Sequence, residues 1–82
     1  MVQVRLFTLL SQATGLDSYE SSAKDVEGLL SELLQRHGES VARYLEGCIV
    51  LVNGTNAGYL RGKKTKLKDG DEVSLFPPIA GG

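Results

Sequence analysis

The first residues of the chain alternate between apolar and polar side chains. Val2, Val4 and Leu6 alternate with Gln3, Arg5 and Phe7. This is the period-two pattern of a strand with one buried face. A weaker alternation around Tyr19, in residues 16–21, follows a glycine-containing turn. We therefore expect two strands at the start, joined as a hairpin with a loop longer than two residues.

A helical pattern comes next. Ser22 and Asp25 stand three residues apart, like a capping box in which the serine hydroxyl accepts a first-turn N–H. From about 23 to 37, the apolar stripe that should face the core consists of Val26, Leu29, Leu30, Leu33, Leu34 and His37. We expect Gly38 to end this helix. Gly28 inside it either allows a close approach to the sheet or is tolerated, at a cost of about 1 kcal/mol.

The middle of the chain predicts a hairpin. Residues 41–47 indicate a short helical turn or a loop, and residues 48–52 are an apolar, largely β-branched run typical of a strand. Asn53-Gly54 ends that run with two residues that tolerate positive φ, which is a strong hairpin signal. Residues 58–68 then predict a looped connection with one short strand at most.

The last strand is expected at residues 72–76, after a tight turn at Asp69-Gly70. Pro77-Pro78 should stop further strand pairing because proline has no backbone donor. The order predicts an α+β fold of the β-grasp (ubiquitin-like) type, a mixed four- to five-stranded sheet with one main helix across one face. We assign residues 1–76 to this domain and residues 77–82 to an extended tail.

In a β-grasp sheet the first and last strands lie side by side in the middle. The side chains expected to face the helix from these two strands are Val2, Val4, Leu6, Val73 and Leu75. With that register, Phe7 and Phe76 point to the opposite face of the sheet, which should be exposed to water.

Length and composition limit the chain to one small domain. It has 82 residues, 41% of them hydrophobic and 23% charged, which resembles an ordinary soluble domain with one modest core and no deep catalytic cleft. The net charge of −1 does not point to a nucleic-acid partner. Neither an apolar run of membrane-spanning length nor a signal-peptide pattern occurs, so no membrane partner and a cytoplasmic location are expected.

The sequence contains no recognisable catalytic or metal-binding motif. His37 is the only histidine, and its place on the apolar side of the helix favours a core-edge or helix-dipole role over that of a base. Cys48 is the only cysteine, which excludes an internal disulfide, and in an apolar strand it is expected to act as a small hydrophobic residue. The acids Asp69, Asp71 and Glu72 surround a glycine turn, which explains them without a metal.

A basic segment contains five of the nine basic residues within eight positions: Arg61, Lys63, Lys64, Lys66 and Lys68. These charges are either a solvated loop or an electrostatic docking surface for an acidic partner. Nucleic-acid binding is less favoured, because no aromatic residue is interleaved with the lysines to stack on a base.

The sequence ends in Gly-Gly after a diproline. A stiff stem of residues 77–80 would hold the end clear of the sheet, and Gly81, without a Cβ, could pass through a narrow channel. The reactive group would be the α-carboxylate of Gly82, which ATP could activate as an acyl adenylate for conversion to a thiocarboxylate or an amide. The alternative is a frayed chain end in which the two glycines have no function.

This ending resembles a known family. Residues 70–73 and 75–82 are similar to the end of the MoaD/ThiS family of ubiquitin-like sulfur carriers, and the Phe-Pro-Pro form is similar to its MoaD branch, the small subunits of molybdopterin synthase. Weaker similarity at residues 50–54 and 65–69 and in the opening strand extends the resemblance over most of the chain.

The resemblance implies a carrier that is not itself an enzyme and binds no cofactor or metal. An adenylating enzyme related to ubiquitin activators would use ATP and Mg²⁺ to adenylate Gly82, and a sulfur-transfer protein would complete the thiocarboxylate. Catalysis would take place in a MoaE-like large subunit, and the free carrier would be a monomer. The resemblance implies partner contacts at Phe7, Leu51, Phe76, Pro77, Pro78, Ile79 and Ala80. Many relatives carry arginine where this chain has Ser11, so a salt bridge from that position is not expected.

Three other functions stay open. The chain could be a protein modifier that forms an isopeptide bond through Gly82, as archaeal relatives do. It could carry sulfur to thiazole, tRNA or cysteine synthesis, although those carriers usually lack the Phe-Pro-Pro stem. It could also be a plain interaction module, in which case its function would survive removal of the tail.

Overall fold

A five-stranded mixed sheet is the centre of the fold in a computed structural model, which describes residues 1–78. The strands are β1 (Val2–Leu6), β2 (Ser18–Ser21), β3 (Ile49–Val52), β4 (Thr55–Asn56) and β5 (Glu72–Phe76). Their order across the sheet is β2-β1-β5-β3-β4. β1 and β5 are parallel and the other neighbours are antiparallel. The predicted β-grasp arrangement, with the first and last strands side by side, is confirmed.

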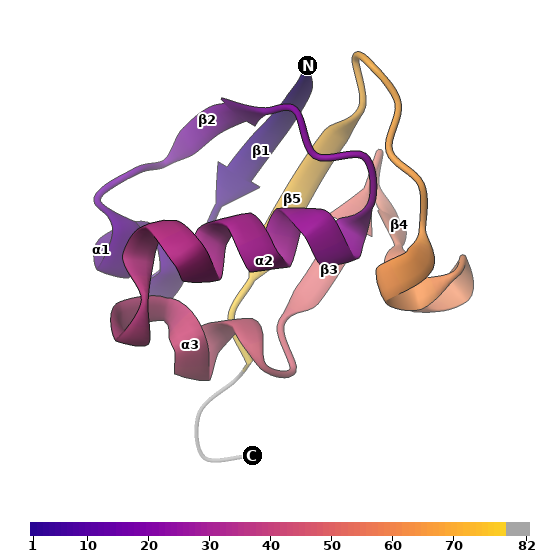
Figure 1. The fold of residues 1–82 in the computed structure, drawn as a ribbon. Helices are drawn as coiled ribbons and strands as arrows, with labels where there is room; N and C mark the ends of the chain where they lie inside the picture. Colours follow the sequence, from indigo (N-terminus) through magenta and orange to yellow (C-terminus); the bar gives the residue numbers. More distant parts are fainter. Residues whose placement is uncertain (79–82) are drawn as a thin grey trace.

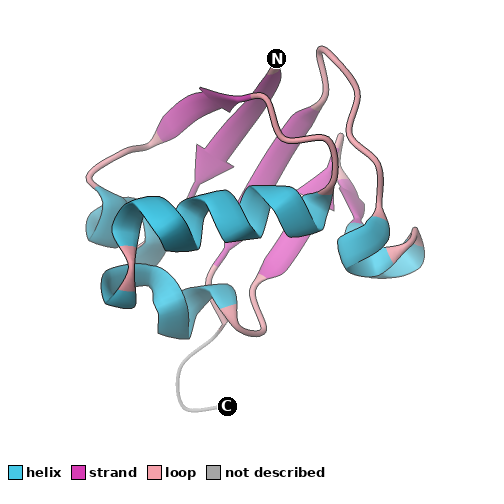
Figure 2. Cartoon of the chain, viewed as in Figure 1, coloured by secondary structure: helices cyan, strands magenta, loops and turns pink. Residues whose placement is uncertain are grey.

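Helices cover one face of this sheet. The helices are α1 (Leu9–Thr14), α2 (Val26–His37) and α3 (Glu39–Leu45), and two short 3-10 turns, η1 (Ala57–Tyr59) and η2 (Gly62–Lys64), follow β4. α2 crosses in front of the strands, and α1 and α3 lie near its C-terminal end (Figure 1). In Figure 2 all three helices lie on one side of the magenta strands. The other face of the sheet, which we call the open face, has no helix over it among residues 1–78.

The core lies between the sheet and α2. All five residues predicted to face the helix from β1 and β5 are buried, namely Val2, Val4, Leu6, Val73 and Leu75. Leu29 and Leu33 of α2 pack against them from the other side, with Leu10 and Val41 closing the core from α1 and α3. Each such side chain contributes about 1.5–3 kcal/mol when fully buried.

The connection between β1 and β2 differs from the predicted hairpin loop, because it contains α1. Leu10 of α1 is buried, and the Thr14 hydroxyl donates a hydrogen bond to the Leu10 carbonyl oxygen (2.9 Å). Gly15, with φ of 76°, ends the helix in the left-handed conformation that glycine tolerates. A helix this short owes its stability to the packing of Leu10 and not to its own propensity.

α2 begins at Val26, later than predicted, and its cap is Asp25 and not Ser22. The Asp25 carboxylate accepts a hydrogen bond from the Gly28 N–H (2.7 Å). The residues before the helix are held in an extended form, since the Leu67 N–H donates to the Lys24 carbonyl (2.9 Å). Gly28 is exposed and does not approach the sheet, and a Cβ there would lie 3.0 Å from the Asp25 carboxylate.

Part of the apolar stripe of α2 is not buried in the core. Leu34, predicted to be in the core, is 47% exposed, and Leu30 is only half-buried. Both residues turn toward α3, where they line a shallow groove with Ala42 and Leu45. α3 itself confirms the helical alternative for residues 41–47, although it begins earlier, at Glu39.

The Asn53-Gly54 hairpin is confirmed. Asn53 and Gly54 have φ of 50° and 86°, as a two-residue hairpin turn of this kind requires. The Asn53 side chain also ties the turn to the last strand, because its amide NH₂ donates to Asp71 and its oxygen accepts from the Glu72 N–H, both at 2.9 Å. Within residues 1–78, no helix has the length and apolar character needed to cross a membrane.

Candidate functional site

An apolar patch occupies one end of the open face. We use the name apolar patch for Phe7, Ile49, Leu51 and Phe76. These residues come from the end of β1, from β3 and from the end of β5, and each lies next in sequence to a buried residue that faces the helix. The alternation of strand side chains therefore directs all four toward the face that α2 leaves uncovered.

The centre of the patch is a pair of stacked aromatic rings. The ring centroids of Phe7 and Phe76 are 4.4 Å apart and the ring planes differ by 9°. The Phe7 N–H donates to the Leu75 carbonyl oxygen (3.2 Å), which extends the β1–β5 pairing by one residue and brings the rings together. Both side chains are half-buried. Their predicted placement on the open face is confirmed, and their role in docking stays a prediction.

β3 supplies the other half of the patch. Val50 and Val52 are buried toward α2, so Leu51 between them lies on the open face. Leu51 pairs with Ser74, and Ile49 pairs with Phe76 and is 41% exposed. Ile49 was not predicted from the sequence, although the alternation that directs Leu51 outward gives Ile49 the same direction.

The far end of the open face is polar. The Arg5 guanidinium and the Glu72 carboxylate form an ion pair with an Nε–Oε2 distance of 3.3 Å. Both side chains are about half exposed, so the pair contributes at most about 1 kcal/mol. Glu72 is the first residue of β5 and Phe76 the last, so the acidic partner of this ion pair lies at the opposite end of the strand from the aromatic pair.

The chain leaves the sheet beside the apolar patch. Pro77, directly after Phe76, is buried and Pro78 is half-buried, so the base of the predicted stem packs onto the domain. The predictions for Ile79, Ala80, Gly81 and Gly82 concern residues outside the described part of the chain, and they stay predictions. The tail thus begins with a rigid proline pair directly beside the apolar patch.

A shallow hollow of about 380 Å³ adjoins Phe7 at the corner of β1, α1 and β2. Ser11 lines it and donates a hydrogen bond from its hydroxyl to the Asp17 carboxylate (2.5 Å). Ser11 therefore binds the Asp17 carboxylate through an uncharged hydroxyl.

The other candidate residues are Cys48, the acids near Gly70 and His37, and burial and hydrogen bonds account for their surroundings. Burial raises the pKa of the Cys48 thiol, which lowers its reactivity as a nucleophile. The Asn53 amide and the Lys68 backbone N–H hydrogen-bond to Asp71 and lower its pKa, and Asp69 contacts the N-terminal amine of Met1. His37 is half-buried at the end of α2. Residues 1–78 include no group of three or more histidine, cysteine or acidic side chains placed to hold a metal ion.

Comparison with known proteins agrees with this geometry. The model of the ThiS family matches residues 4–82. A protein of Archaeoglobus fulgidus named as a sulfur carrier protein is 37% identical over 78 residues, which cover 95% of this chain and 70% of that protein.

Two solved structures show how far the likeness extends. The small archaeal modifier protein 1 from Methanosarcina acetivorans superposes with a TM-score of 0.83 at 30% identity, over 99% of this chain and 95% of that chain. A chain in the complex of subunits 1 and 2 of molybdopterin-converting factor from Helicobacter pylori superposes with a TM-score of 0.67 at 31% identity, over 99% and 97% of the two chains.

Proposed function

This chain belongs to the ThiS family of ubiquitin-like sulfur carriers, and we propose that it donates sulfur in the synthesis of molybdopterin. In this proposal Gly82 carries the reactive carboxylate, the chain is the small subunit of molybdopterin synthase, and a MoaE-like large subunit performs the catalysis. The solved complex of two molybdopterin-converting factor subunits, one chain of which resembles this protein, supports the pairing.

The chemistry requires activation of a poor electrophile. A carboxylate resists nucleophilic attack because it is charged and because oxide is a poor leaving group. An adenylating partner would join the Gly82 carboxylate to AMP from ATP, releasing pyrophosphate, with Mg²⁺ held by that partner. A sulfide equivalent from a sulfur-transfer protein would then attack the carbonyl carbon and expel AMP, which leaves a thiocarboxylate.

The apolar patch is the observation that carries the proposal. Phe7, Ile49, Leu51 and Phe76 lie on a face that no helix of the described chain covers, at the end of the strand from which residues 77–82 depart. A partner that buries this patch would fix the domain against its own surface and direct the tail into its active site. Removing the patch from water supplies the affinity, and the tail supplies the chemistry.

Reconstitution tests the tail chemistry. The full chain is incubated with its cognate adenylating enzyme, ATP, Mg²⁺ and a sulfide source, and its intact mass is measured. We expect an increase equal to the difference between a sulfur and an oxygen atom, and none in a matched chain that lacks Gly82. An increase that persists in the shortened chain, or no increase with any cognate activating enzyme, would reject the proposal.

The acceptor is tested separately. The thiocarboxylate form is mixed with a MoaE-like subunit and the cyclic pterin precursor, and dithiolene formation is followed. A product that forms with the thiocarboxylate and not with the carboxylate form would support the molybdopterin pathway. Thiocarboxylate formation without pterin product would leave the carrier function intact and reject this acceptor.

Protein modification is a second candidate, and the likeness to the small archaeal modifier protein 1 favours it. In that case the activated Gly82 would form an amide with the side-chain amine of a lysine on another protein. Trypsin cuts last after Lys68 in this chain. Tryptic digestion of cell extract would then yield lysine peptides that carry residues 69–82 of this chain as a branch. Their absence from cells that express the chain would count against this function.

A further inference from the structure

The charges of this chain are divided between two parts of the molecule. Five of the nine basic residues lie between positions 61 and 68, and none of the ten acidic residues lies between positions 47 and 68. Residues 47–68 therefore carry a net charge of +5, and the rest of the chain carries four positive and ten negative charges, a net of −6. We call residues 57–68 the basic lobe.

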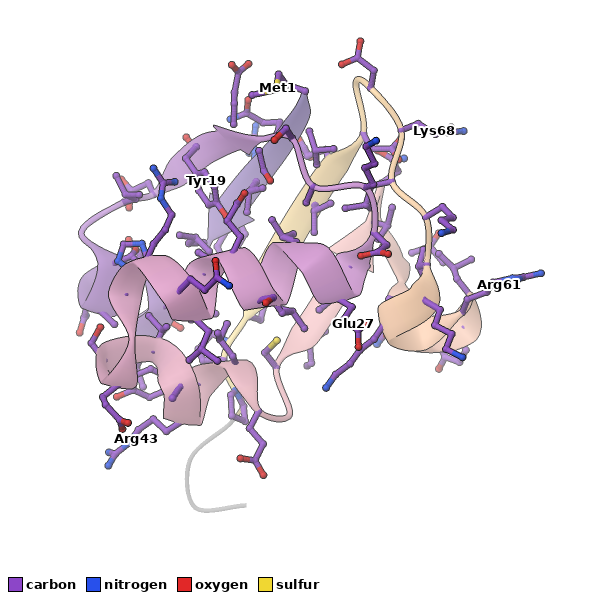
Figure 3. All side chains as sticks on the ribbon, viewed as in Figure 1. Met1, Tyr19, Glu27, Arg43, Arg61 and Lys68 are labelled. Carbon is purple, nitrogen blue, oxygen red and sulfur yellow. The ribbon has the colours of Figure 1, made fainter. Side chains whose placement is uncertain are left out.

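The cations of the basic lobe are available for a partner. Arg61, Lys63, Lys64, Lys66 and Lys68 are all exposed. The two ion pairs among residues 1–78, Met1 with Asp69 and Arg5 with Glu72, use none of them. Arg61 points outward from the edge of the molecule in Figure 3.

An aromatic and an aliphatic side chain stand beside these cations. Tyr59 is 86% exposed and Leu60 is 48% exposed, directly before Arg61 in the chain. Tyr19, by contrast, is half-buried and donates its hydroxyl to Glu32 (2.9 Å). Tyrosine and arginine are, with tryptophan, the residue types enriched among those that dominate binding energy in protein interfaces.

The lobe is rigid although it contains no strand. Backbone N–H groups of Leu60 and Thr65 donate to the carbonyls of Ala57 and Gly62 (2.9 and 3.1 Å), and the Arg61 N–H donates to the Thr65 hydroxyl (3.0 Å). Ala57 and Thr65 are buried and anchor the two turns in the domain. A surface held in this way loses little conformational entropy on binding.

The lobe is separate from the apolar patch. It follows β4, the strand at the edge of the sheet, and it joins the start of α2 through a hydrogen bond from the Val26 N–H to the Thr65 carbonyl (3.0 Å). Figure 1 shows the lobe at the β4 edge, beyond β3. Contacts confined to the lobe would not involve Phe7 or Phe76.

We propose that the basic lobe is a second docking surface, and that its partner is a protein with an acidic surface surrounding an apolar depression that receives Tyr59. Complementary charge would speed the encounter and fix its orientation. The contact of Tyr59 and Leu60 with the depression would hold the complex. A nucleic acid fits less well, because the aromatic residue precedes the cations without alternating with them and the rest of the chain, at −6, repels phosphate. The inference does not depend on the chemistry at Gly82.

The test begins by identifying what contacts Tyr59. The full chain with Tyr59→benzoylphenylalanine, a photo-crosslinking residue, is expressed in its own organism and irradiated. The crosslinked species is identified and the protein found is purified. Its affinity for the full chain is then measured with the natural sequence, Tyr59→Ala, Arg61→Glu and Arg43→Glu, each first checked for an unchanged melting temperature.

Arg43→Glu is the matched control, because it makes the same charge change at another exposed arginine. Arg43 and Arg61 lie at opposite sides of the molecule in Figure 3. We expect Tyr59→Ala and Arg61→Glu each to weaken binding by about tenfold or more, and Arg43→Glu by no more than about twofold. Affinity for the natural chain should also fall as sodium chloride rises from about 50 to about 300 mM.

Four outcomes would overturn the inference. They are the absence of any crosslinked protein, equal effects of Arg61→Glu and Arg43→Glu, crosslinking to nucleic acid alone, and crosslinking only to a second copy of this chain. The last two would assign the lobe to nucleic-acid binding or to self-association instead.

Discussion

Phe7 and Phe76 stack ring on ring, with centroids 4.4 Å apart, although they come from opposite ends of the described chain. The parallel pairing of β1 and β5 causes this meeting, because it aligns the end of the first strand with the end of the last. The result is an apolar surface placed where the tail begins. In the proposed function, a partner that receives the tail would contact this surface.

The aromatic pair gives a prediction that separates docking from folding. Phe7→Ala removes a half-buried ring, so we expect a loss in the free energy of unfolding of about 1–2 kcal/mol, near the value of an aromatic contact. Binding to the MoaE-like subunit should weaken by about tenfold or more, since the same ring would be fully buried there. Urea unfolding and calorimetric titration measure the two effects.

Leu75→Ala is the control for that experiment. Leu75 is fully buried on the helix side, so its truncation should cost about 2–5 kcal/mol. If Phe7→Ala destabilises the fold as much as Leu75→Ala does, then Phe7 is a core residue and the docking assignment is wrong.

A second prediction concerns clearance around the tail. In the proposed cycle Gly81 passes through a channel of the adenylating enzyme, and a Cβ at that position would meet its wall. We expect Gly81→Ala to keep the melting temperature of the natural chain and to slow adenylation by at least about tenfold. Thermal unfolding and pyrophosphate release measure these effects. A lowered melting temperature would show instead that residue 81 packs against the domain.

The start of α2 provides a matched pair of substitutions. Asp25 caps the helix by accepting the Gly28 N–H, whereas Ser22 is exposed and lies outside it. Asp25→Ala should therefore lower the free energy of unfolding by about 1 kcal/mol, and Ser22→Ala should change it by less than about 0.5 kcal/mol. Chemical unfolding of both variants tests this, and the reverse order of effects would restore Ser22 as the cap.

The sequence predicted those parts of the fold in which burial repeats with a fixed period. Val2, Val4 and Leu6 alternate cleanly because one face of β1 packs on the core and the other is wet. The same alternation predicted the outward direction of Phe7 and Phe76. Ile49 follows the identical rule, so its place in the apolar patch was available from the sequence and was overlooked.

Other features depend on contacts that no local pattern reveals. α1 is six residues long and shows one buried side chain, Leu10, which is too little for a helical period to be recognised. α2 is capped by Asp25 and not by Ser22 because residues 24–26 bond to residues 65–67, about forty positions away in the chain. Leu34 matches the stripe and yet is exposed, because α3 packs beside it without covering it.

The last prediction concerns pH and Asp71. The Asn53 amide (2.9 Å) and the Lys68 backbone N–H (2.8 Å) donate to its carboxylate and lower its pKa in the folded chain. A lowered pKa means that folding favours the charged form, so the stabilisation is present above the unfolded pKa of about 3.9 and is lost as pH falls below it. In Asp71→Asn this dependence is removed. The amide NH₂ takes the place of one of the two accepting oxygens, so one of the two donors loses its acceptor.

We therefore expect Asp71→Asn to lower the free energy of unfolding by about 1–3 kcal/mol at pH 7, the range for hydrogen bonds to a charged group. The difference from the natural chain should shrink as pH falls through about 4 toward 2, because protonation weakens the same hydrogen bonds in the natural chain. Urea unfolding of both proteins across this range measures it. A difference that stays constant with pH would show that the loss arises from packing at residue 71 and not from its charge.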